Sequence, residues 1–493
     1  MSLPRFLAHC LGALLVLALL GCAYPTRNQE AQVISDSSGY RWDNLKPGKL
    51  EDTLVIVTAS GGGTRATALT LSVLSALDKV VLPGGGTLAR EVDVISSVSG
   101  GSVAAAHFAL AGPDGFKALE DDFIRRDGIG ALLGAGLNPV GLARLSTMGR
   151  ERIDLLIDYL DRQLFEGARY QTLLDRGRRP YLLLNAADMV EGVPFAFTQR
   201  KLDLLCSDLA RLPLATAVAA SAAFPVALSP VTLTNYQPCA AVDGRRWPPA
   251  WVEASLDDPA DPFAEPSLWY DNQRRATLGR AEYAYSLGRN APAGEQKRYV
   301  HLLDGGIADN LGVFEPYRML TTRDTRPSFL ADIDSGRITK LVFIVINARS
   351  FATSDLDRSP ATPGMLDMLA ASINAPIDRA TASTADQLRD LLLDKFRQLD
   401  LADKTAAERF QKLGRNTALI SVDFDAIADQ GCRRKFQGIP TSWTLERAQI
   451  DAVLQVGGAL LANDPAFADL LRITAAPRPA LPSLKETCET LGF

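Results

Sequence analysis

Two segments of the chain place a reactive side chain where an apolar run ends. The run 94–98 stops at Ser99 and the run 299–303 stops at Asp304, and two glycines follow each of these residues. A serine on a sharp strand-to-helix turn is exposed for nucleophilic attack. A carboxylate at the end of a second strand can lie beside the serine and take its proton. The pair predicts cleavage of an ester bond through a serine nucleophile and an aspartate base.

The turn around Ser99 matches the second half of the nucleophile elbow Gly-x-Ser-x-Gly. Gly101 supplies the second glycine, whereas Ser97 stands in place of the first. That position has to be small because the strand and the helix approach closely there. Ser97 and Ser102 are rival nucleophiles, but neither has a glycine two residues later. A glycine-rich turn of purely structural use is the alternative to an elbow.

A second glycine-rich loop, 60–65, follows the strand predicted over 53–59. Three consecutive glycines leave backbone N–H groups unshielded, and the start of the next helix adds the positive end of its dipole. We expect Gly61, Gly62 and Gly63 to form an oxyanion hole for a tetrahedral acyl intermediate. A phosphate loop is the alternative, but neither the lysine of a Walker motif nor a Gly-x-Gly-x-x-Gly fingerprint is present.

The histidines of the chain are poorly placed to serve Ser99 as a base. His9 lies in the N-terminal apolar segment, and His107 follows Ser99 by eight residues, about 12 Å along a helix. His301 is three residues before Asp304 on a predicted strand, so the two point to opposite faces. Asp304 is therefore expected to be the base. Because an exposed aspartate has a pKa near 3.9, we expect burial to raise the pKa of Asp304.

Apolar runs that alternate with helical patterns predict an α/β fold, with a central, mainly parallel sheet between two layers of helices. Strands are expected over 53–59, 92–98, 181–184, 300–303, 341–345 and 418–422. Helices are expected over 65–80, 102–110, 151–165, 213–222, 384–399 and 444–462.

Four separated motifs resemble those of the patatin-like phospholipases. They are the loop 60–66, the turn at Ser99, Ala219-Ala220-Ser221-Ala222-Ala223-Phe224-Pro225, and Asp304-Gly305-Gly306. Their Gly-Gly-Gly-x-Arg-Ala and Ser-Gly-Gly-Ser forms are most similar to the cytosolic phospholipase A branch, and the resemblance covers residues 51–350.

This resemblance implies a three-layer, patatin-like hydrolase with a Ser/Asp dyad and with no metal or other cofactor. Ser99 would be the nucleophile and Asp304 the base. Arg65 is similar to an arginine that neutralises a lipid phosphate in that branch, whereas an arginine on the helix surface is the alternative. Ser97 is the one clear departure from the family pattern.

The first 21 residues have the form of a secretory signal. Arg5 precedes an apolar run over 11–20 that is too short for a membrane-spanning helix. The run ends in Leu19-Leu20-Gly21-Cys22, which resembles a bacterial lipobox, where the cysteine is lipidated after cleavage. Ala23, by the same resemblance, favours the outer membrane. We expect Cys22 to carry a lipid anchor in the cell envelope, with the protein facing the periplasm; an ordinary signal peptide or a short anchor is the alternative.

The predicted organisation is a signal peptide over 1–21, a tether over 22–50, a catalytic domain over 51–475 and a tail over 476–493. An insertion at 238–296 is rich in proline and contains Trp247, Trp251 and Trp269. Because tryptophan favours the lipid–water boundary, this insertion suggests a lid, with a packed surface insertion as the alternative. The stretch 128–149 is too short to span a bilayer and is expected to cap the acyl pocket or to fill core.

Four cysteines are left once the signal is removed and Cys22 is modified. Cys206, Cys239, Cys432 and Cys488 can form two disulfides in an oxidising compartment, in any of three pairings. Four buried free thiols are the alternative.

The overall composition limits the classes of partner. The 493 residues are 47% hydrophobic and 22% charged with a net charge of −5, which is typical of a globular protein and argues against nucleic acid as a partner. We expect a membrane-tethered acyl hydrolase acting on phospholipid or another lipid ester. A catalytically silent binding or scaffold lipoprotein on the same fold, or a surface adhesin, is the alternative.

Overall fold

The structure is a computed structural model that describes most of the chain. The described residues are 27–126, 151–237, 279–287, 297–321, 329–350, 383–398 and 404–490, without 33, 36 and 226, together with isolated positions between 252 and 381. Within these residues, no helix is long and apolar enough to cross a membrane.

A single sheet of eight described strands forms the centre of the molecule, in the order β5-β6-β3-β2-β1-β7-β8, with β4 paired to β3. Five strands run parallel: β1 (Thr53–Ala59), β2 (Val94–Val98), β3 (Tyr181–Asp188), β7 (Lys340–Asn347) and β8 (Thr417–Asp423). The antiparallel strands are β4 (Pro194–Ala196), β5 (Val231–Thr234) and β6 (Tyr299–Asp304).

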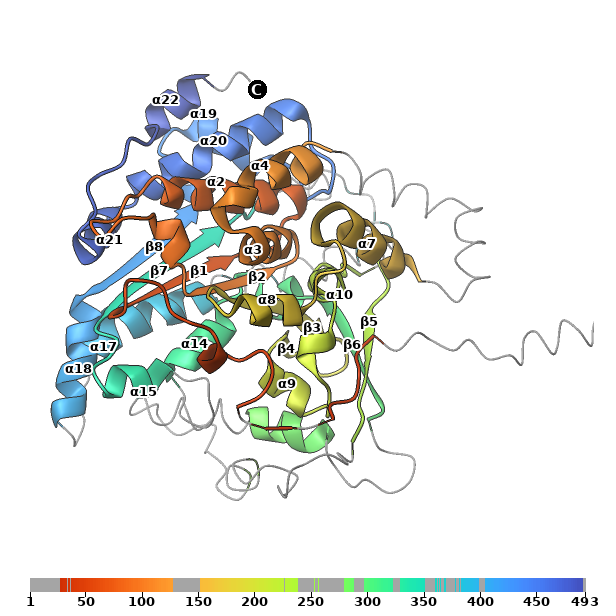
Figure 1. The fold of residues 1–493 in the computed structure, drawn as a ribbon. Coiled ribbons are helices and arrows are strands. Elements are labelled where there is room, and N and C mark those ends of the chain that lie inside the picture. The colour runs from red at the N-terminus through yellow and green to blue at the C-terminus, as the bar shows by residue number, and fades with distance from the viewer. Residues whose placement is uncertain are drawn as a thin grey trace, which may run out of the picture.

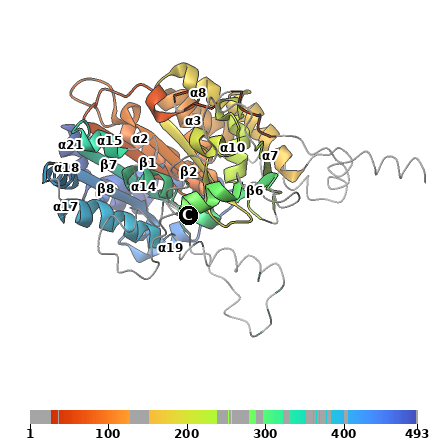
Figure 2. The same ribbon diagram turned by 90° about the horizontal axis from the view of Figure 1, so that it is seen from below.

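Helices cover both faces of this sheet, as the buried, nearly continuous apolar sequences of β1 and β7 require. Figure 1 shows α2, α3 and α20 above the sheet and α14, α15, α17 and α18 below it. In Figure 2, seen from below, α17 and α18 gather at the β8 end of the sheet. The predicted three-layer α/β fold with a mainly parallel sheet is confirmed.

The helices named in the text have the following bounds: α2 (Gly63–Asp78), α3 (Gly100–Ala111), α4 (Phe116–Leu119), α7 (Arg152–Leu160), α8 (Tyr170–Arg176), α9 (Gln199–Asp203), α10 (Leu214–Ser221), α13 (Gly306–Asp309), α14 (Phe314–Thr321), α15 (Phe329–Asp334), α17 (Phe396–Gln398), α18 (Lys404–Arg415), α19 (Gln430–Gln437), α20 (Arg447–Asn463), α21 (Phe467–Thr474) and α22 (Leu484–Thr490).

The segment 27–50 packs on the domain, which differs from the predicted tether. Tyr40 is fully buried, its hydroxyl accepts a hydrogen bond from the backbone of Leu182 at 2.8 Å, and its ring stacks on Tyr181 with the centroids 5.2 Å apart. Trp42 and Leu45 are buried as well. These apolar contacts make the segment part of the folded unit from Arg27 onward.

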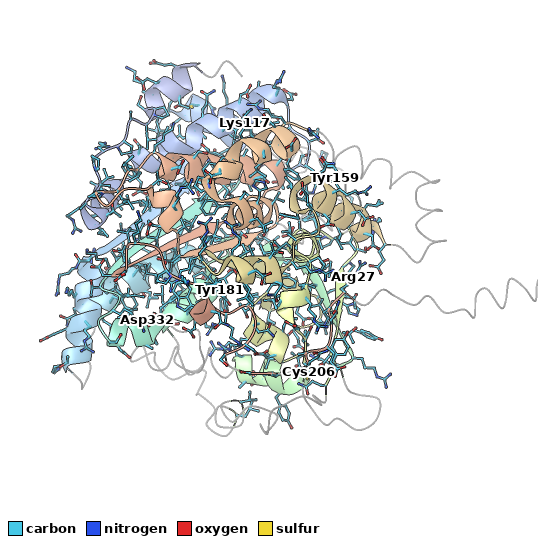
Figure 3. The ribbon with its side chains drawn as sticks, viewed as in Figure 1. Arg27, Lys117, Tyr159, Tyr181, Cys206 and Asp332 are labelled. Carbon is cyan, nitrogen blue, oxygen red and sulfur yellow. A yellow bond between two sulfur atoms is a disulfide. The ribbon has the colours of Figure 1, made fainter. Side chains whose placement is uncertain are left out.

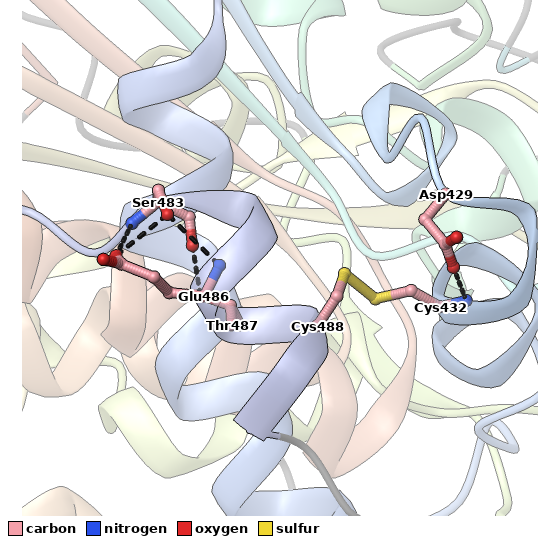
Figure 4. Close-up of a disulfide and its surroundings, with 6 residues drawn as sticks. All are labelled: Asp429, Cys432, Ser483, Glu486, Thr487 and Cys488. Carbon is pink, nitrogen blue, oxygen red and sulfur yellow. Dashed lines mark hydrogen bonds between the residues drawn. A yellow bond between two sulfur atoms is a disulfide. The ribbon is translucent and has the colours of Figure 1, made fainter.

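The C-terminal segment is also attached, where the sequence predicted a tail. Cys488 of α22 forms a disulfide with Cys432 of α19 (Figure 4), and α22 packs on α20. Cys206, labelled in Figure 3, is disulfide-bonded too. Free thiols are therefore wrong for these three cysteines, and disulfides are right.

Several predictions fall on residues outside the described part of the chain. They are the signal peptide with Cys22, the stretch 128–149, Cys239 and the three tryptophans of the insertion. The predicted domain boundaries stay predictions.

Candidate active site

Ser99 occupies the turn between β2 and α3. Its backbone has φ 51° and ψ −122°, a conformation that a residue with a Cβ atom rarely adopts. Its side chain is nearly buried, with 7% of the residue exposed. This positive φ is the geometry of a nucleophile elbow, and it holds the serine at the tip of the turn.

Asp304 ends β6 and faces Ser99 from the neighbouring part of the sheet. The Ser99 hydroxyl lies near enough to the carboxylate to lower its pKa, and Oδ1 accepts the N–H of Gly306 at 2.8 Å. Burial raises the pKa of Asp304 to about 6, against the lowering effect of these two donors. The carboxyl group thus has a higher proton affinity than an exposed aspartate, as a base for a hydroxyl requires.

Ser221, at the end of α10, is hydrogen-bonded both to the turn that carries Ser99 and to the loop that follows Asp304. Its hydroxyl accepts the N–H of Ser99 at 2.9 Å and donates to the carbonyl of Asn185 at 2.6 Å. Its own carbonyl accepts the N–H of Gly305 at 3.1 Å. One buried residue therefore positions the serine turn, strand β3 and the loop that follows Asp304.

Ser97 and Ser102, the two rival nucleophiles, are hydrogen-bonded to the same network below Ser99. Ser97 donates from its hydroxyl to that of Ser102 at 3.1 Å, and the Ser102 hydroxyl lies 2.9 Å from that of Ser221. Both Ser97 and Ser102 are fully buried. The hydroxyl that replaces the elbow's first glycine therefore extends the hydrogen-bond chain beneath Ser99.

The glycine loop 60–63 lies directly beside Ser99. A Cβ atom on Gly61 would come within 3.3 Å of the Ser99 Cβ. The N–H of Gly61, however, already donates to the carbonyl of Asn310 at 3.2 Å. Of the three predicted oxyanion donors, Gly61 is thus occupied, whereas the N–H groups of Gly62 and Gly63 make no hydrogen bond within the described part of the chain.

The two glycine turns touch each other at the N-termini of α2 and α3. A Cβ atom on Gly100 would lie 2.0 Å from the carbonyl oxygen of Gly63, so only glycine fits there. The hydroxyl of Thr67 donates to the carbonyl of Gly100 at 2.7 Å and fixes the contact. The N–H of Gly100, also without a partner among the described residues, adds the donor that follows the nucleophile in such elbows.

Arg65 is buried, with 1% of the residue exposed, and its donors have protein partners. Nε donates to the carbonyl of Ala348 at 2.8 Å, Nη2 to the hydroxyl of Thr441 at 2.9 Å, and Nη1 to the carbonyl of Ile439. These bonds tie α2 to the loops after β7 and α19. The structure gives Arg65 this packing role, and the helix-surface alternative is wrong; contact with a lipid phosphate stays a prediction that would require these bonds to open.

Neither described histidine takes part in the Ser99 network. His301 shares a hydrogen bond of 2.9 Å with Thr232 on β5, and His107 is buried in α3, where burial lowers its pKa. No group of three or more His, Cys, Asp or Glu side chains suited to a metal ion occurs in the part of the chain that the structure describes.

Three residues of this site carried no assigned role in the sequence. Ser221 lay in a recognised motif but was given no role there, and Gly100 was visible only as part of the turn. Asn310 places its side-chain oxygen 2.7 Å from the point where a Cβ of Gly61 would lie and 2.9 Å from that of Gly306. Its position between the two glycine segments follows from tertiary packing, which sequence spacing does not show.

Comparison with known proteins supports the family resemblance over part of the chain. Residues 57–256 match the family model described as patatin-like phospholipase. This stretch contains the glycine loop, Ser99 and Ser221, and over it the resemblance is confirmed. Asp304 lies beyond it.

Among solved structures, the chain is similar to human GIVD cytosolic phospholipase A2, at 15% identity over 60% of this chain and 43% of that one, with a TM-score of 0.31. It is also similar to the same human enzyme in complex with methyl gamma-linolenyl fluorophosphonate, at 13% identity over 90% and 60% of the two chains, with a TM-score of 0.35. The chain thus spans 43% to 60% of the length of these structures. No match was found among curated proteins.

Proposed function

We propose that this protein is a lipid acyl hydrolase that cleaves carboxylic ester bonds through a Ser99/Asp304 dyad. The observation that carries the proposal is a serine with a strained backbone beside a buried carboxylate whose pKa its hydroxyl influences. The family match over 57–256 supports a lipid ester as the substrate class.

In the proposed mechanism, the Ser99 oxygen attacks the ester carbonyl while Asp304 takes the hydroxyl proton. The negative oxygen of the tetrahedral intermediate lies against the N–H groups of Gly62, Gly63 and Gly100, at the positive ends of two helices. When the intermediate collapses, Asp304 returns the proton to the leaving alkoxide. Water then hydrolyses the acyl-serine with Asp304 again as base.

A fluorophosphonate probe tests the nucleophile. The wild-type protein should be labelled covalently, and Ser99→Ala should lose the label and the hydrolysis of phospholipid vesicles, while Ser102→Ala, if it folds, keeps the label. Asp304→Asn should lose hydrolysis by about 10³-fold or more with the fold intact, since both acylation and deacylation need the base. Labelling of the Ser99→Ala protein would contradict the assignment of the nucleophile, and a wild-type protein that takes no label would favour a silent scaffold.

We also propose that the protein is anchored by lipid at Cys22 and faces the periplasm from the outer membrane. The lipobox-like sequence supports this placement. Incorporation of labelled fatty acid into wild type but not into Cys22→Ser, with fractionation of the envelope, tests it. Hydrolysis of extracted lipids followed by mass spectrometry would show whether phospholipid, lysophospholipid or neutral lipid is preferred.

A further inference from the structure

A small, strongly cationic cavity lies beside the site, between β4, α9, α14 and the helical segment 279–287. Its volume is about 60 Å³, and its lining includes Arg200, Lys201, Arg280 and Arg318 with Glu315 as the one carboxylate. Since a water molecule needs about 10–15 Å³ of such space, there is room for roughly four to six waters. A phosphate group, with five non-hydrogen atoms, is of this size.

The ammonium group of Lys201 is held by aromatic rings instead of a carboxylate. Nζ lies 3.8 Å from the ring centroid of Tyr283 and 5.5 Å from that of Phe195. In the described residues it makes no hydrogen bond and no ion pair. Burial lowers the pKa of Lys201 to about 7, which is the expected response of an ammonium that lacks a counter-ion.

The acidic groups nearby are committed to other donors. Glu315 Oε1 accepts Nη2 of Arg318 at 2.6 Å and its Nε at 2.9 Å. Asp188 accepts the hydroxyl of Tyr283 at 2.9 Å and the N–H groups of Val190 and Glu191 at 2.9 and 3.1 Å. The lining holds four cationic side chains and one carboxylate, and the Lys201 ammonium has no acidic partner among the described residues. Such an excess in a confined space favours an anionic ligand.

We propose that this cavity is a binding site for a phosphate-type oxyanion, with the Lys201 ammonium as its central contact. Guanidinium forks match the geometry of phosphate oxygens, so the arginines of the lining suit the same ligand. Asn185 lines the cavity, and its carbonyl accepts the hydroxyl of Ser221. The site therefore adjoins the network beneath Ser99.

Calorimetric titration of the full chain with inorganic phosphate, at fixed ionic strength in chloride buffer, tests the site. Lys201→Met keeps the length of the side chain and removes its charge, so it should weaken phosphate binding on the order of tenfold or more. Lys201→Arg should retain binding, as should Lys412→Met, which removes an exposed lysine of α18. No binding to the wild type, or equal binding to Lys201→Met, would overturn the proposal.

A second pair of measurements distinguishes a lipid headgroup from a free anion as the ligand. These two measurements rest on the proposed function, whereas the phosphate titration does not. The ratio of hydrolysis rates is compared between a phospholipid and an uncharged glycerol ester in the same vesicles. A headgroup ligand predicts that Lys201→Met lowers this ratio on the order of tenfold and that phosphate competes with phospholipid. If the ligand is a free anion, Lys201→Met should lose phosphate binding but keep the wild-type ratio of hydrolysis rates. If the wild type hydrolyses neither lipid, the proposed function fails while the phosphate titration still decides the cavity.

Discussion

At the scale of single residues, the ionisation of Asp304 makes the proposed mechanism measurable. A base must be unprotonated to act, and burial raises the pKa of this carboxyl group to about 6. The kcat/KM for a soluble ester should therefore fall about tenfold per pH unit below that value, through one ionisation. A pH–rate profile checks this. A profile that stays flat down to about pH 4, the range of an exposed aspartate, would contradict the assignment.

Ser221 should act as a positioning residue. In Ser221→Ala the N–H of Ser99 and the carbonyl of Asn185 lose a buried partner, so we expect kcat to fall roughly tenfold or more and unfolding free energy to fall by about 1–3 kcal/mol. Ser72→Ala is the matched control, because among the described residues this buried hydroxyl donates to one group, the carbonyl of Leu454 on α20.

The control should lose stability in the same range but keep kcat. Equal kcat in the two variants would show that Ser221 supports the fold alone. Thermal melts and steady-state kinetics on a soluble ester measure the two quantities separately.

Side-chain chemistry at the site was partly predictable from the sequence. Ser99 and Asp304 were visible because each ends a buried apolar run before glycines. That the Gly61 amide is occupied was not predictable, since its acceptor, the carbonyl of Asn310, lies about 250 residues away in the chain and reaches it only through the fold.

At the scale of elements, long apolar strands were predictable and short edge strands were not. The predicted strand over 53–59 coincides with β1, because a parallel strand buried on both faces reads as one apolar run. β5 alternates buried and half-buried residues over only Val231–Thr234, and β4 has three residues. Such short segments carry too little periodicity for a prediction.

The contact between α2 and α3 should depend on Gly100. In Gly100→Ala the new methyl group would meet the carbonyl oxygen of Gly63 at 2.0 Å, so the two helix N-termini must separate. We expect a loss of about 2–4 kcal/mol in stability, together with most activity. Gly84→Ala is the control, since nothing lies within 4 Å of its added Cβ. Urea denaturation of both variants measures the difference in stability. Equal denaturation midpoints for Gly100→Ala and Gly84→Ala would contradict the close contact.

The disulfide between α19 and α22 should stabilise the C-terminal part of the domain. Cys432 and Cys488 are 56 residues apart in the chain, and closing a loop of that length is worth about 4 kcal/mol in the chain-entropy account. Cys488→Ser should therefore lower the melting temperature, and dithiothreitol should lower that of the wild type by more than that of the variant, which keeps the disulfide of Cys206. A wild-type melt that is insensitive to reductant would contradict the prediction.

At the scale of the whole molecule, the N-terminal segment determines how the proposed anchor and the domain are related. Its polar composition suggested a tether over 22–50, but buried aromatic side chains attach it to the sheet from Arg27 on. Arg27, labelled in Figure 3, pairs with Asp154 of α7 at 2.5 Å, and Asn28 donates to the carbonyl of Thr234 at the end of β5. Only four residues then separate Cys22 from Arg27, so the five Cα–Cα steps between them reach about 17 Å at most.

This short reach would bring the start of β6 and the turn after β3 near the bilayer surface. Met189 donates its N–H to the carbonyl of His301 at 2.8 Å, which places the turn beside β6. Val190 is 69% exposed and Tyr299, opposite Thr234, is 56% exposed. Exposed apolar and aromatic side chains on one edge suit an interface with lipid.

Replacing these side chains should therefore separate activity on membranes from activity in solution. Val190→Asp and Tyr299→Asp remove apolar contact with the bilayer and add a charge, so we expect hydrolysis of vesicles to fall about fivefold or more, while a soluble ester is cleaved at the wild-type rate. Val81→Asp is the control, because Val81 is similarly exposed, at 53%, and follows α2 in the chain instead of belonging to β6 or the turn after β3. Vesicle flotation together with both assays measures the effect. If Val81→Asp lowers vesicle hydrolysis as much as the other two, the surface at β6 does not face the membrane.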